Sequence, residues 1–125
     1  MKKIFQYLVS ALVLSILVSS CYYDKVVVYT GVPTNVSFKN DILPILNQHC
    51  NTTGCHDATP SHAPSLVEAN AYNALILGQY VNTVDPASSI FYKEVEAGSM
   101  PPSGALGINQ QKLILGWITD GALDN

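Results

Sequence analysis

The chain has 125 residues, of which 48% are hydrophobic and 12% are charged, and its formal net charge is −3 at pH 7. This length suits one small domain. The chain has six lysines and no arginine, and so sparse a positive charge argues against a protein that binds nucleic acid, which needs clustered cations.

The N-terminus predicts export. Residues 1–3 are basic at two positions, residues 4–18 are almost wholly apolar, and small residues follow. Val18-Ser19-Ser20-Cys21 resembles the lipobox of bacterial lipoproteins, in which the cysteine becomes the lipidated first residue. We therefore expect a lipoprotein signal peptide at 1–20 and a lipid on Cys21. The protein would be anchored to a bacterial envelope membrane on its periplasmic or surface side. An uncleaved transmembrane anchor is the alternative.

The cysteine count agrees with export. If Cys21 carries lipid, one pair of the three cysteines remains, Cys50 and Cys55. In an oxidising compartment that pair would form a disulfide or a haem attachment site. After residue 20 about 105 residues are left, with four lysines and nine carboxylates, or about −5. A domain this small would gain stability from a large apolar cofactor at its centre.

Residues 21–36 are predicted to be mainly a tether, with packing along the domain as the alternative. Val26–Tyr29 has β propensity but is short and isolated. The domain itself is expected to occupy residues 37–125. Its first helix is predicted from about Asn40 to His49, because Pro44 has to lie near the first turn. Ser37 or Asn40 would cap this helix. Its apolar face would consist of Phe38, Ile42, Ile45 and Leu46.

Two shorter helices are predicted in the middle of the chain. The first runs from about Leu66 to Leu77, with Ser65 and Glu68 as a capping box and Gly78 as its end. The second lies within residues 89–96, after a helix start at Asp85-Pro86. Glycines and prolines make residues 98–107 a loop.

The clearest helix is the last one. Asn109 is a suitable cap, and Gly121 would end the helix. Its apolar stripe consists of Leu113, Ile114, Trp117 and Ile118. Gly116 costs about 1 kcal/mol inside a helix relative to alanine. We therefore expect another backbone, or a flat ring, to approach the helix closely at Gly116.

The segment Cys50-Asn51-Thr52-Thr53-Gly54-Cys55-His56 has the residue types that hold a c-type haem. Two thiols can add across the haem vinyl groups, and the adjacent imidazole then lies under the iron. The usual spacer between the cysteines has two residues, whereas this one has four. Gly54 would permit the extra bulge by taking a positive φ.

Met100 is the candidate ligand for the other side of the iron. It is the only methionine besides the initiator, and two prolines after it stiffen its loop. A methionine opposite a histidine stabilises ferrous iron and raises the reduction potential. The predicted haem site therefore has Cys50 and Cys55 as attachment points and His56 and Met100 as iron ligands.

Other interpretations of these residues stay open. Cys50 and Cys55 could form a disulfide, and they could bind zinc together with His56 and either His49 or His62. His56 could be a surface histidine, and Met100 could be a packing residue. His62 is a further candidate for the distal iron ligand.

Four segments, taken in order, resemble small bacterial c-type cytochromes, in particular the planctomycete-type cytochrome c domain. They are residues 38–46, 50–56, 100–102 and 111–122. The resemblance implies an all-α, class I-like cytochrome c fold with three to five helices around one covalently attached haem c. It also implies that the first and last helices cross, with Phe38 and Trp117 as candidates for their contact.

The function expected from these features is that of a membrane-tethered monohaem cytochrome, a one-electron carrier and not an enzyme. Its partners would be a membrane or periplasmic redox protein and, through the lipid anchor, the membrane itself. One alternative is a haem-free, disulfide-stapled envelope lipoprotein with a binding or structural role. Another is a peroxidase-like haem site, if Met100 does not bind iron.

Overall fold

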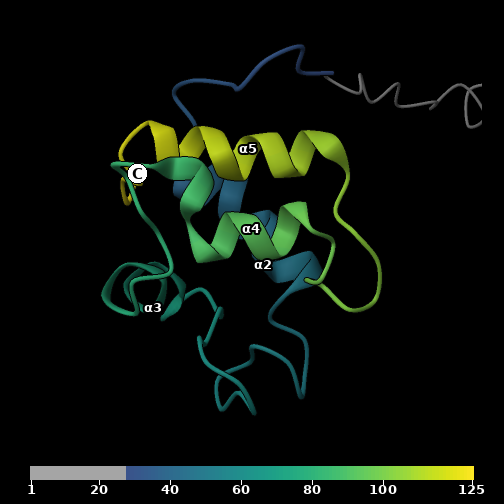
Figure 1. Ribbon diagram of the computed structural model, residues 1–125. Helices are drawn as coiled ribbons and strands as arrows, with labels where there is room; N and C mark the ends of the chain where they lie inside the picture. The colour runs from purple at the N-terminus through teal and green to yellow at the C-terminus, as the bar shows by residue number, and fades with distance from the viewer. Residues whose placement is uncertain (1–27) are drawn as a thin grey trace, which may run out of the picture.

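The structure is a computed structural model and describes residues 28–125 (Figure 1). These residues form four α-helices, one π-helical turn and one 3-10 turn, and this part of the chain has no strand. The all-α prediction is therefore confirmed for the described part. The predicted signal peptide and Cys21 lie outside it. Among the described helices, none is long and apolar enough to cross a membrane.

The first helical segment consists of η1 (Phe38–Ile42) and α2 (Leu43–His49). It begins two residues before the predicted start, and Ser37 is its cap, since the Ser37 hydroxyl accepts a 3.1 Å hydrogen bond from the Asn40 N–H. The wider π-helical turn places Pro44 in the first turn of α2. A proline is tolerated there because a first-turn N–H has no partner within the helix.

The predicted capping box at Ser65 and Glu68 is wrong, because α3 (Ala71–Leu77) begins only at Ala71. The Ser65 hydroxyl instead donates a 2.8 Å hydrogen bond to the carbonyl oxygen of Asp57. Leu66 is buried, so its apolar character reflects packing of a loop and not of a helix. Gly78 follows the last residue of α3, as predicted.

The chain continues through η2 (Pro86–Ser88) and α4 (Ile90–Glu96) to α5 (Ile108–Thr119). Asn109 is not the cap of α5. The cap is Gly107, whose N–H donates a 3.1 Å hydrogen bond to Oε1 of Gln110. The Asn109 side chain has a partner elsewhere, because its Oδ1 accepts a 3.2 Å hydrogen bond from the Tyr29 N–H.

The core is built around the contact between the first and last helical segments. The rings of Phe38 and Trp117 lie 5.2 Å apart, which confirms the predicted contact, and Tyr72 packs edge-on against Phe38 at 5.3 Å. Trp117 is completely buried, and its Nε1–H donates a 2.9 Å hydrogen bond to the Leu123 carbonyl. The ring contact and this hydrogen bond fix α5 against η1.

Hydrogen bonds join the same region to residue 125. The N–H of Phe38 donates to Oδ1 of Asn125 at 2.8 Å, and the N–H of Lys39 donates to the Asn125 carbonyl at 2.9 Å. The Ser37 hydroxyl also donates to that carbonyl, at 2.8 Å. Residues 87 positions apart in the chain are thus held together at one end of the core.

Residues 29–36 run along α5 and are called the strap below (Figure 1). At one end of the strap, the Lys112 ammonium group donates a hydrogen bond to the Tyr29 carbonyl. At the other end, the Val36 N–H donates a 3.0 Å hydrogen bond to Oδ2 of Asp120, and the Val36 side chain is buried. The described part of the predicted tether therefore packs along the domain.

The strap packs directly against α5 at Gly116. A Cβ atom at this position would overlap the Pro33 carbonyl oxygen and would lie 3.0 Å from Cγ2 of Val36. The predicted close approach of another backbone at Gly116 is confirmed, and that backbone belongs to the strap.

We expect Gly116→Ala to lower the free energy of unfolding by about 1–3 kcal/mol, because the new methyl group overpacks the strap contact. The direction of this change tests the strap contact, because alanine in a helix without the strap would instead raise the free energy of unfolding by about 1 kcal/mol. The measurement is the denaturant midpoint of the purified protein. Gly31→Ala is the matched control, because nothing lies within 4 Å of its new Cβ. A more stable Gly116→Ala protein would contradict the packing of the strap.

Candidate functional site

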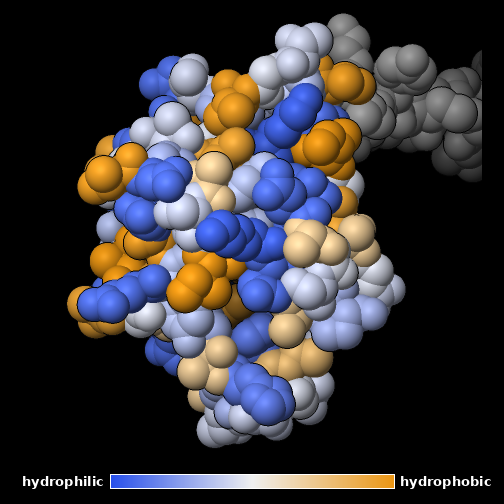
Figure 2. Space-filling model, in the orientation of Figure 1, coloured by the Kyte–Doolittle hydropathy of each residue, from blue (hydrophilic) through white to orange (hydrophobic). Residues whose placement is uncertain are grey.

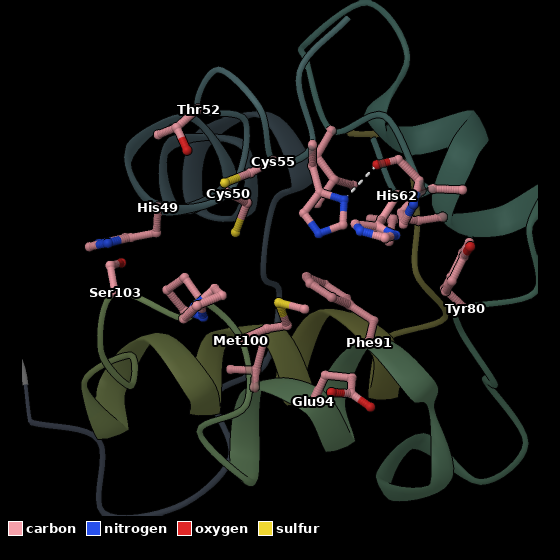
Figure 3. A pocket seen from close by; sticks show the side chains of 18 of the residues that line it. His49, Cys50, Thr52, Cys55, His62, Tyr80, Phe91, Glu94, Met100 and Ser103 are labelled. Carbon is pink, nitrogen blue, oxygen red and sulfur yellow. Dashed lines mark hydrogen bonds between the residues drawn. The ribbon is translucent and has the colours of Figure 1, made fainter. Parts of the chain in front are cut away.

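A cavity of about 950 Å³ lies between the end of α2, α3, α4 and the loops that follow α2 and α4 (Figure 3). Its volume is near the upper end of the range for small-molecule sites. In the space-filling view a recess with apolar surface lies below α4, between α3 and the end of α2 (Figure 2). The cavity is lined by every predicted haem-site residue: Cys50, Cys55, His56 and Met100.

The loop after α2 brings the two cysteines and the histidine together. Cys50 is the buried cap residue at the end of α2, whereas Cys55 is exposed. The N–H of His56 donates a 3.2 Å hydrogen bond to the Cys50 carbonyl, so the spacer closes into a loop that returns to its start. Gly54 has a φ of +82°, as predicted. The two extra spacer residues therefore do not separate His56 from Cys50.

Asp57 holds this loop in shape and was not predicted as a site residue. Its Oδ2 accepts a 2.9 Å hydrogen bond from the Gly54 N–H, and its Oδ1 accepts one of 3.0 Å from the Thr59 N–H. Aspartate commonly stabilises turns by accepting hydrogen bonds from nearby backbone groups. The signal available in the sequence was an aspartate placed between glycine and threonine in a segment poor in helix formers.

The imidazole of His56 is fixed in one tautomer. Its Nδ1 lies 2.7 Å from the carbonyl oxygen of Pro64, and because a carbonyl oxygen only accepts, Nδ1 carries the proton (Figure 3, dashed line). The Nε2 atom is then left with a lone pair. Histidines that bind metals usually donate their other ring N–H to a carbonyl or carboxylate in this way. In this tautomer Nε2 is the ring atom of His56 that has a lone pair for a metal ion.

Met100 lies across the cavity from the cysteines, with its sulfur pointing toward them (Figure 3). Its N–H donates a 3.0 Å hydrogen bond to the Glu94 carbonyl, and the Ser99 hydroxyl donates one of 2.8 Å to the same oxygen. Pro101 is buried, while Met100 remains 37% exposed. The end of α4 therefore positions the thioether.

The walls of the cavity are mainly apolar. Buried side chains from three parts of the chain contribute to them: Leu66, Leu75, Phe91 and Val95. Among Asp, Glu, Lys and Arg residues, Glu94 alone belongs to the lining. Such a cavity suits a large, flat and mostly apolar ligand, with a few polar groups to orient it.

The two remaining histidines of the lining differ in their contacts. Oε1 of Gln110 accepts from the Gly107 N–H, so the Gln110 amide nitrogen faces His49 and donates to its Nε2 at 3.1 Å. The Nε2 lone pair of His49 is therefore already used. His62 is exposed in the loop between α2 and α3.

No group of three or more His, Cys, Asp or Glu side chains converges on a common point within residues 28–125. The four-ligand zinc interpretation therefore has no support in the described part of the chain. A haem iron, by contrast, would take one histidine and one methionine from the protein and needs no such group.

Both thiols of the cavity are free in the structure. Burial and, to a smaller extent, the neighbouring Cys55 together raise the pKa of Cys50 to about 11. At neutral pH the Cys50 side chain is consequently a protonated thiol, which is inert toward reagents that need a thiolate.

No family model, curated protein or solved structure matches the chain. The resemblance to c-type cytochromes thus stays a prediction from the sequence motifs. The chemistry proposed for the protein accordingly depends on the cavity and on the residues gathered in it.

We expect the two thiols of the haem-free protein to react with iodoacetamide at different rates. At pH 8 only about one Cys50 in a thousand is a thiolate if its pKa is about 11, and the group is also buried. Cys50 should therefore react about tenfold or more slowly than exposed Cys55, and the difference should shrink as the pH rises toward 11. Mass spectrometry of the modified peptides measures both rates. Equal rates in the folded protein would contradict the buried environment of Cys50. In urea, which unfolds the protein, the two rates should become equal, and this measurement is the control.

Proposed function

We propose that this protein is a monohaem c-type cytochrome that carries electrons one at a time and is tethered to a bacterial envelope membrane through Cys21. The observation that carries the proposal is the composition of a single cavity. It has two cysteines on one wall, a histidine with its Nε2 lone pair unused, and a methionine sulfur on the other side. A class I-like cytochrome c fold for residues 37–125 is part of this proposal.

Each residue has a separate role in it. The thiols of Cys50 and Cys55 would add across the two vinyl groups, so that each sulfur bonds to one vinyl carbon and the thiol hydrogen goes to the other. His56 would bind the iron through Nε2, and Met100 would bind it through its sulfur. Bound haem supplies the ferric/ferrous couple, and the chain supplies the attachment, the axial ligands and the surroundings.

The environment of His56 and Met100 favours electron transfer over catalysis. Because His56 and Met100 would both hold the iron, no position on it would be left for a substrate. The Pro64 carbonyl would hold the His56 ring in place, and the Glu94 carbonyl would hold the Met100 loop. Fixed ligands reduce the rearrangement that accompanies a change of oxidation state. Apolar walls around a bound haem would favour the ferrous form, because it carries less charge.

We expect the protein, when made together with haem-attachment enzymes, to keep its haem through denaturation and acid extraction. Thioether bonds resist acid, whereas a haem held only by iron ligands is released. Cys50→Ser and Cys55→Ser should each leave one thioether, and the double variant should leave none. Thr52→Ala, also on the cavity wall, is the matched control and should keep both. The pyridine haemochrome spectrum of the extracted protein distinguishes these states. Complete release of haem from the unaltered protein would rule out the proposed function.

We expect Met100→Ala to abolish the sulfur-to-iron charge-transfer band at the red end of the visible spectrum of the ferric protein. It should also lower the reduction potential by on the order of 100 mV and let carbon monoxide bind to the ferrous protein, because a ligand position opens. His62→Ala, which changes another histidine of the lining, should have none of these effects. If only the His62→Ala spectrum changes, the distal ligand is His62 and the carrier has a lower potential.

A further inference from the structure

We propose that the strap restricts the orientation of the domain on the membrane, so that the cavity end of the molecule cannot be turned directly toward the bilayer. This inference rests on the proposed function, because it takes Cys21 as the lipid-anchored residue. It also specifies the kind of partner. This partner is a redox protein that docks outside the bilayer, and not one that reaches the cavity from within the membrane.

The strap is attached to α5 along its whole length. Lys112 and Asn109 hold Tyr29 at one end, and Asp120 holds the Val36 N–H at the other. Between these points, Pro33 packs directly onto Gly116. A chain leaving the domain toward Cys21 therefore departs from Tyr29 and not from the start of η1.

The attachment of the strap shortens the reach of the anchor. Eight residue steps separate Cys21 from Tyr29, and a fully extended chain covers about 3.6 Å per step, or about 29 Å. Without the strap contacts, sixteen steps would separate Cys21 from Ser37 and would cover about 58 Å. The strap contacts therefore halve the maximum distance between the lipid-anchored residue and the point at which the chain leaves the domain.

The shorter reach is less than a reversed orientation requires. A compact domain of about 100 residues has a radius of gyration of about 13 Å and hence an outer radius of about 17 Å. If the α5 side faced away from the bilayer, the chain would have to pass around the domain and down to the membrane, a path of about 44 Å for a sphere of that radius. A reach of about 29 Å forbids this orientation, whereas about 58 Å would allow it.

The cavity lies at the end of the molecule that this constraint turns away from the membrane. The strap crosses the outer side of α5, while the loop between α2 and α3 lies at the opposite end of the molecule (Figure 1). That loop carries Cys55 and His56 and forms one wall of the cavity. A partner would meet the cavity from the aqueous side.

The test uses the lipidated haem protein in vesicles and two single-cysteine labels. Thr34→Cys places a fluorophore on the strap, and Thr59→Cys places it on the loop at the cavity end; both positions are exposed. Cys21, Cys50 and Cys55 are all consumed in the proposed holoprotein, so the introduced thiol is the one that reacts. Lipids with a nitroxide on the headgroup quench a fluorophore near the bilayer. We expect quenching at Thr34→Cys to be at least twofold stronger than at Thr59→Cys.

The matched variant carries eight glycine and serine residues inserted between Lys25 and Val26, which restores the longer reach. We expect the ratio of quenching at the two positions to fall toward one. Equal quenching in the protein without the insertion, or an unchanged ratio with it, would overturn the orientation and leave the proposed function standing. A protein that does not bind vesicles, or whose native cysteines still react with the label, would overturn the proposed function itself and this inference with it.

Discussion

The packing of Phe38 against Trp117 is the interaction on which the rest of the structure depends. It joins the first described helical segment to the last one, and both side chains are buried. Tyr72 adds α3 to the same aromatic cluster through its contact with Phe38. Because η1 continues directly into α2, this cluster also sets the direction in which α2 runs. The position of Cys50 at the end of α2 is a consequence of aromatic packing at its beginning.

The cavity combines fixed and exposed groups in a way that agrees with the proposed role. Cys50 is delivered by a helix, and the His56 ring is held by the Pro64 carbonyl. Cys55 and Met100 lie on loops and are partly or fully accessible. A covalently attached group would be fixed from the buried side and remain close to solvent on the other. An electron carrier needs this combination, because its cofactor has to be rigid and yet near the surface of a partner.

Sequence patterns predicted the features that depend on neighbouring residues. They failed where a residue distant in the chain takes the hydrogen-bonding group of the predicted side chain. The helical periodicity, the positive φ of Gly54 and the close approach at Gly116 are each specified by a few neighbouring residues or by one unusual residue. The cap at Asn109 is wrong because Tyr29, 80 positions away, uses its side-chain oxygen. The role of Pro64 could not be predicted either. It orients His56 through its backbone carbonyl, and every residue type has that group. The gathering of Met100 with Cys50 was predicted from motif order alone.

The hydrogen bonds between Asn125 and the residues around Phe38 have a consequence for the order of events during biogenesis. A chain is synthesised and exported from its N-terminus, and contacts between distant residues form late. If the chain is exported as proposed, Cys50 and Cys55 would cross the membrane while about 70 residues still follow them, among them all of α5. During that interval the core cannot close, because Trp117 has not yet reached Phe38. The thiol of Cys50, which the finished fold buries, would therefore be open to haem-attachment enzymes until export is complete, and folding would then close off access to it.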